Sequence, residues 1–212
     1  MPADEFQPLC ADLESGHHDC WTPVEVFGYE GCHFFGHVSY FDHAPPMKWT
    51  GYCGGGMATG LGFLSDDRGN TAEGLLVDGL KERTWTVRLA NGGVITENHV
   101  KGVFHGTWTF DLPKGHFYAV TYEDGRLHGP WEHRQADDYS EVGRYEAGER
   151  QGVWTLSWAN DVEAVVPYVD GVVQGEITVA REGRPLGTLI YWKGRHVEGF
   201  LAPELIGPPL DP

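Results

Sequence analysis

The chain has 212 residues, of which 30 are glycine and 13% are aromatic, and its 15 basic and 31 acidic residues give a formal net charge of −16. This charge argues against nucleic acids and anionic membranes as partners, because both are polyanions. Abundant glycine and aromatic residues without long helix-forming runs predict an all-β protein of short strands and tight turns.

The N-terminal segment, residues 1–48, is irregular and rich in cysteine. Cys10, Cys20, Cys32 and Cys53 all lie in the first quarter of the chain. An even number of clustered cysteines favours one or two disulfides, while free thiols and a metal site stay open as alternatives. Because the pattern lacks Cys-x-x-Cys, we predict neither a metal site nor a cofactor.

The compartment depends on the state of these cysteines. The N-terminus has no basic region followed by an apolar stretch, as a signal peptide would. We expect a periplasmic or cell-envelope protein if a leader has been removed and the cysteines are paired, and a cytoplasmic protein otherwise.

From residue 49 to residue 200 the sequence repeats every 23 residues in the pattern Tyr-x-x-Gly-x-x-x-Gly-x-Trp. Such self-similarity is typical of repeat architectures. The residues that mark the repeat are Gly79, Trp85, Gly102, Trp108, Tyr122, Gly125, Trp131, Tyr145, Gly148, Trp154, Tyr168, Gly171, Tyr191 and Gly194. The proline-rich residues 201–212 form a C-terminal tail outside the repeats.

Each unit reads as a β-hairpin. Asp78-Gly79, Asp124-Gly125 and Asp170-Gly171 suit two-residue turns that need positive φ angles. The predicted fold is therefore an all-β, elongated antiparallel meander of about seven hairpin repeats, estimated by dividing the repeat region by its period, with an irregular N-terminal cap.

A two-residue turn at Asp124-Gly125 also predicts the pairing of the strands. Tyr122 would pair with Leu127, Val120 with Gly129 and Tyr118 with Trp131, which gathers apolar side chains on one face. The pattern weakens in the unit where Glu141 and Arg150 fall on this inner face.

Two packing expectations follow from that pairing. The second glycine of each unit, such as Gly129, would leave room for aromatic rings to lie flat. Successive tryptophans, two strands apart, would be separated by about 9.6 Å, so they would pack on the intervening tyrosines and not on one another.

The repeat resembles the MORN (membrane occupation and recognition nexus) repeat over about residues 50–200, and is most similar to its bacterial variant, with an aromatic residue before Asp-Gly and Gly-x-Trp after it. The resemblance implies a scaffold. Eukaryotic MORN proteins are scaffolds, some of them lipid-associated. Bacterial proteins with the variant are often labelled antitoxins, and some look like immunity proteins that bind a toxic effector.

No serine lies in a Gly-x-Ser-x-Gly motif, and the phosphate-loop and His-Glu-x-x-His motifs are missing, so we predict no catalytic residue. We expect an immunity or antitoxin-like protein that neutralises a protein partner such as a basic toxin or secreted effector. A lipid- or membrane-associated scaffold and an enzyme are the alternatives. Open sheet edges also leave a homo-oligomer open. The candidate partner-binding residues are Asp66, Asp67, Glu123, Asp124, Asp137, Asp138 and Trp158.

Overall fold

The computed structural model describes residues 21–26, 31–37, 47–136 and 138–201. About 75% of the chain is β-strand, and the described residues contain no α-helix. The strands are mostly antiparallel and follow one another in chain order, which confirms the predicted all-β meander of hairpins. The chain forms two compact units, residues 1–106 and 107–212, and the boundary lies within the repeat region.

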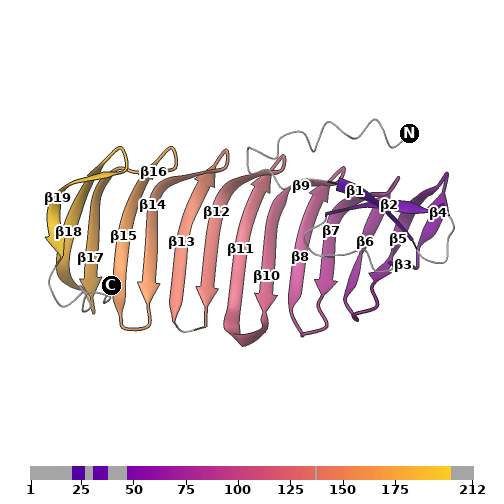
Figure 1. Ribbon diagram of the computed structural model, residues 1–212, viewed down its shortest axis with the longest axis horizontal. Coiled ribbons are helices and arrows are strands. Elements are labelled where there is room, and N and C mark those ends of the chain that lie inside the picture. Colours follow the sequence, from indigo (N-terminus) through magenta and orange to yellow (C-terminus); the bar gives the residue numbers. More distant parts are fainter. Residues whose placement is uncertain (1–20, 27–30, 38–46, 137, 202–212) are drawn as a thin grey trace, which may run out of the picture. The chain divides into compact units, whose positions relative to one another are not determined.

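Unit 1 combines a short N-terminal hairpin with the first repeats (Figure 1). Its strands are β1 (Trp21–Glu25), β2 (His33–His37), β3 (Lys48–Trp49), β4 (Tyr52–Gly54), β5 (Met57–Ser65), β6 (Thr71–Val77), β7 (Leu80–Arg88), β8 (Val94–Val100) and β9 (Val103–Phe104). Strand β2 contacts the turns of the first repeats through backbone hydrogen bonds. The His33 amide donates to the Gly56 carbonyl at 2.9 Å, and the Phe35 amide donates to the Gly79 carbonyl at 2.8 Å. Phe34, Phe35 and Met47 are buried in the resulting core.

Unit 2 is a single antiparallel meander (Figure 1). Its elements are β10 (Gly106–Leu112), a 3₁₀ turn (Pro113–Gly115), β11 (His116–Glu123), β12 (Arg126–Gln135), β13 (Tyr139–Glu146), β14 (Glu149–Trp158), β15 (Val162–Val169), β16 (Val172–Val173), β17 (Gly175–Arg181), β18 (Arg184–Trp192) and β19 (Arg195–Leu201). None of the described elements of unit 2 forms a second layer on this sheet.

The predicted two-residue turns have the geometry that hairpins require. Both turn residues have positive φ, for example 48° at Asp124 and 79° at Gly125, and Asp78-Gly79 and Asp170-Gly171 are similar. This conformation matches the twist of the flanking strands.

The predicted pairing is right next to the turn and wrong beyond it. Tyr122 pairs with Leu127 as expected, but Val120 pairs with Trp131 and Tyr118 with His133. A β-bulge at Gly129, with φ of 97°, places two extra residues on β12. Because the shift is an even number, the same side chains still share the inner face.

The second glycine of the repeat therefore serves the backbone and does not make room for rings. A Cβ at Gly152 would meet nothing within 4 Å, yet its φ is 68°, a region that side chains rarely adopt. The residue that makes room is a different glycine, five positions before the glycine of the turn. A Cβ on Gly143 would lie 2.2 Å from the Trp154 ring, and one on Gly74 would lie 2.3 Å from Trp85.

The tryptophans pack on the intervening tyrosines, as expected, but two of them are also closer together than predicted. Tyr145 contacts both Trp131 and Trp154, with ring centroids 5.5 and 5.2 Å away. The Trp131 and Trp154 centroids are only 6.4 Å apart. Gly143 pairs with Trp131 on the strand between them and has no side chain, so the Trp154 indole leans across it.

Candidate functional site

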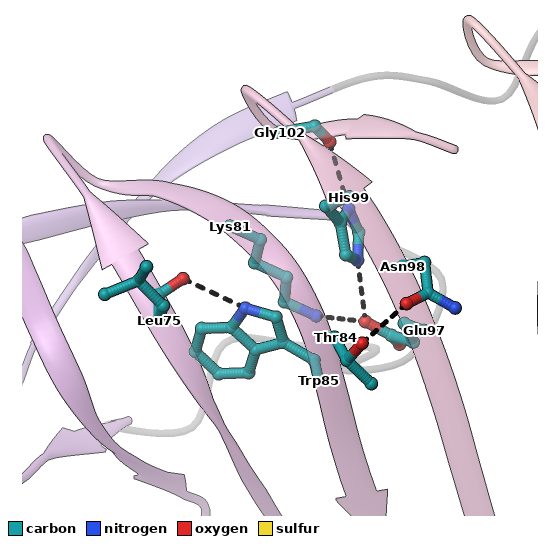
Figure 2. Close-up of polar contacts among 8 residues, drawn as sticks. All are labelled: Leu75, Lys81, Thr84, Trp85, Glu97, Asn98, His99 and Gly102. Carbon is teal, nitrogen blue, oxygen red and sulfur yellow. Dashed lines mark hydrogen bonds and ion pairs between the residues drawn. The ribbon is translucent and has the colours of Figure 1, made fainter. Parts of the chain in front are cut away.

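Unit 1 buries a network of three ionisable side chains (Figure 2). The Lys81 ammonium lies 2.5 Å from Glu97 Oε2, and His99 Nε2 lies 3.0 Å from the same oxygen. His99 Nδ1 is 3.2 Å from the Gly102 carbonyl oxygen. Burial raises the pKa of Glu97, but the charge of Lys81 and the hydrogen bond with His99 outweigh it and lower that pKa to about 2. Glu97 is therefore a buried carboxylate anion.

The Lys81 ammonium also lies over an indole ring. Its distance to the Trp85 ring centroid is 5.1 Å, and the Trp85 N–H donates to the Leu75 carbonyl at 3.0 Å (Figure 2). Lys81, Trp85 and Gly74 thus form a stack of cation, indole and bare backbone, with Glu97 as the counter-ion.

Unit 2 repeats this stack with an arginine. The Arg150 guanidinium lies 4.1 Å from the Trp154 ring centroid, and that ring packs on Gly143. Arg150 Nη2 is 2.7 Å from Glu141 Oε1, and Nη1 donates to the Tyr168 hydroxyl at 3.2 Å. Burial lowers the pKa of Arg150, but hydrogen bonds to Tyr145 and Tyr168 and the charge of Glu141 raise it above its ordinary value. The two charges that disturbed the predicted inner face are therefore each other's partners.

A third cation lies over a ring in unit 2. The Arg134 guanidinium is 4.3 Å from the Phe117 ring centroid, and its Nε is 2.8 Å from Glu132 Oε1. In all three cases a ring, a cation and a carboxylate occur together.

A cavity of about 570 Å³ lies at the end of the β14–β15 hairpin. Its lining is Asp138, Trp158, Ala159, Asn160, Val162, Ala164 and Val179. Pairing of Trp158 with Val162, and of Ala164 with Val179, brings three strands together here. The Ala159 amide donates to the Asp138 backbone carbonyl at 2.9 Å, which holds the backbone of Asp138 beside the residue that follows Trp158. The Trp158 side chain is 39% exposed.

A smaller cavity of about 340 Å³ also contacts Trp158 and Val162, but it lies on the opposite face of the sheet, because Ser157, Glu163 and Ala180 line it. It adds three carboxylates, Asp161, Glu163 and Glu182, and neither cavity is lined by a lysine or arginine. Burial and the charge of Glu141 raise the pKa of Tyr139, which packs beside Trp158 with ring centroids 5.8 Å apart. The first cavity therefore combines aromatic and apolar side chains with a single acidic residue, Asp138.

The predicted partner-binding residues separate into groups. Asp138 and Trp158 share the cavity, whereas Asp137 lies outside the described residues. Glu123 and Asp124 lie at the opposite ends of the strands from Asp138 and Trp158, because Glu123 is the last residue of β11.

The other two predicted residues lie in a turn of unit 1. Asp66 Oδ1 accepts hydrogen bonds from the Arg68 and Asn70 amides, so it shapes its own turn. Asp67 is exposed beside it.

Of the disulfide candidates, Cys32 and Cys53 are joined. The bond ties the N-terminal segment to β4, and Cys32 is fully buried. Cys10 and Cys20 lie outside the described residues.

Sequence reasoning missed the buried ionic groups, although their repeat positions carried a signal. Lys81 and Arg150 occupy a position that is apolar in other units, such as Leu127 and Val173. Glu97 stands where other units have Val120 or Gly143. A cation and an acid that both interrupt apolar positions indicate a buried pair.

The described residues contain no group of three His, Cys, Asp or Glu side chains that could hold a metal ion. In the same part of the chain, no helix is long and apolar enough to cross a bilayer. No protein-family model and no curated protein matches the sequence.

Proposed function

We propose that this protein is a non-catalytic, MORN-like repeat scaffold that binds and neutralises a basic protein, in the manner of an immunity protein or antitoxin. The observation that carries the proposal is the half-exposed Trp158 ring in a cavity beside Asp138, on a chain with a net charge of −16. Aromatic side chains dominate the binding energy of protein interfaces, and opposite charge speeds association.

The contrast between the units supports unit 2 as the binding surface. In unit 1 the core includes Phe34 and Phe35 of β2, so the repeats there already have a packing partner. In unit 2 the described elements form one layer, which leaves the cavity open for a partner.

The buried ionic groups support a structural role and not a catalytic one. Glu97 is 1% exposed and His99 is 2% exposed, so a substrate cannot reach them without unfolding of the sheet. Catalytic acids and bases must come within hydrogen-bond distance of the substrate.

The proposed compartment is the cell envelope. The Cys32–Cys53 disulfide supports it, because such bonds persist in oxidising compartments and are rare in a reducing cytosol.

The test is affinity capture of host proteins on the full-length chain, with mass spectrometry to identify a stoichiometric partner. The partner is then expressed alone and together with this chain, and growth is measured. We expect a basic protein whose toxicity is abolished by co-expression. Binding to anionic vesicles with no protein partner would overturn the proposal in favour of a lipid-associated scaffold.

A further inference from the structure

Three groups in the described part of the chain combine an aromatic ring, a cation and a carboxylate, and they show how the ring of Trp158 can bind a cation. Lys81 over Trp85, Arg150 over Trp154 and Arg134 over Phe117 are each paired with a carboxylate. Trp158 shares its cavity with the acidic residue Asp138, but among the described residues no cation lies over its ring.

Charge favours a cation as the ligand of this cavity. The Trp158 cavity is lined by one acidic residue, Asp138, and by no lysine or arginine, on a chain with a net charge of −16. The second cavity, on the opposite face of the sheet, adds Asp161, Glu163 and Glu182 to the negative charge around Trp158. Arg181 pairs with Val162, two strands from Trp158, and lines neither cavity. Arg181 Nε is buried and has no hydrogen-bond partner.

We propose that the cavity binds an arginine side chain of the basic partner, with the guanidinium over Trp158 and paired with Asp138. Arginine fits better than lysine, because a planar guanidinium stacks on a ring and bonds a carboxylate in two places. The apolar walls formed by Val162, Ala164 and Val179 suit the methylene stem of the side chain. This inference rests on the proposed function and adds how the partner is held.

The test uses the full chain and a peptide in which five arginines alternate with glycine, followed by NMR and calorimetry at 0.15 M salt. We expect the Trp158 indole signal to shift, and the affinity to fall about tenfold in Trp158→Leu and about threefold in Asp138→Asn. Arg181→Gln should raise the affinity about twofold, because it removes a like charge.

Matched controls separate a site from general attraction to an acidic surface. Trp192→Leu removes a tryptophan that is 58% exposed, and Asp111→Asn removes an exposed carboxylate on β10. Both should leave the affinity unchanged, and the same peptide with citrulline in place of arginine should not bind. Equal losses in Trp192→Leu and Trp158→Leu, or binding of the citrulline peptide, would overturn the inference. If Trp158→Leu fails to fold, Asp138→Asn carries the comparison.

The inference and the proposed function can fail separately. If the captured partner is neutralised equally well by wild-type and Trp158→Leu protein, the function stands and the arginine site is wrong. If the arginine peptide binds at Trp158 but co-expression never relieves toxicity, the site stands and the function is wrong.

Discussion

Lys81 and Arg150 occupy the same position of the 23-residue repeat, three repeats apart, and each lies over the indole of the tryptophan four residues later. Their counter-ions lie on different sides. Glu97 is on the strand after Lys81, whereas Glu141 is on the strand before Arg150. The cation over the tryptophan is therefore set by the position in the repeat, whereas the strand that supplies the carboxylate differs between the two repeats.

Arg150→Met should destabilise unit 2 by about 2–4 kcal/mol, because it leaves the Glu141 carboxylate, 8% exposed, without its partner. The double variant Arg150→Met with Glu141→Met should recover most of this loss, since it removes both charges. Urea unfolding of the three proteins measures the effect. A double variant as unstable as the single one would show that the cation–ring packing, and not the ion pair, dominates.

The stability of unit 1 should depend on Glu97 at acid pH. The folded-state pKa of about 2 lies below the ordinary value of 4.5, so the anion stabilises the fold above about pH 4.5. This contribution, on the order of 3 kcal/mol, is lost as the pH falls from about 4.5 toward 2. Urea midpoints across this range should fall more steeply for wild type than for Glu97→Gln. Parallel curves would contradict the assignment.

Gly143→Ala should destabilise unit 2 by about 2–3 kcal/mol, because the new methyl group would overlap the Trp154 ring at 2.2 Å. Gly54→Ala is the matched control, since its Cβ would have ordinary contacts of 3.6 Å or more. Thermal unfolding followed by near-ultraviolet circular dichroism reports both the stability and the Trp154 environment. Equal effects of the two substitutions would contradict the stacking.

Replacing Cys32 and Cys53 by serine should lower the stability of unit 1 by about 3 kcal/mol, as expected for a loop closed over 21 residues. Hydrogen exchange followed by mass spectrometry can measure each unit separately. Protection should fall in β5–β8 and stay unchanged in β13–β18. Loss of protection in both units would show that the bond stabilises more than its own unit.

Rules that depend on residues close in sequence predicted the turns and the faces of the strands. They failed for the register between paired strands, which depends on both strands. Asp124-Gly125 forms its predicted turn because positive φ is a property of those two residues. The bulge at Gly129 shifts the pairing of Val120, and no feature of the Asp-Gly pair reveals it. Because the register shifts by two residues, the same side chains stay on the inner face. The row of aromatic side chains was therefore predictable, although the residues paired across the two strands were not.

The candidate site was predictable only in part. Asp138 and Trp158 were both identified from sequence, but their convergence depends on the hydrogen bond between Ala159 and Asp138 across a turn. The ionic stacks depend on which strand supplies the carboxylate, and Glu97 and Glu141 lie on opposite sides of their cations. Periodicity locates such residues without naming their partners.

The stacking of Trp154 on Gly143 determines which segment should serve as the repeating module when longer or shorter arrays are designed from this chain. A cut at the Ala147-Gly148 turn, inside the repeat motif, separates the Trp154 ring from Gly143 and Arg150 from Glu141. The hairpin from Tyr139 to Trp158 keeps both pairs together. Arrays lengthened or shortened by whole hairpins of this kind, joined before Tyr139 and after Trp158, would retain these stacks.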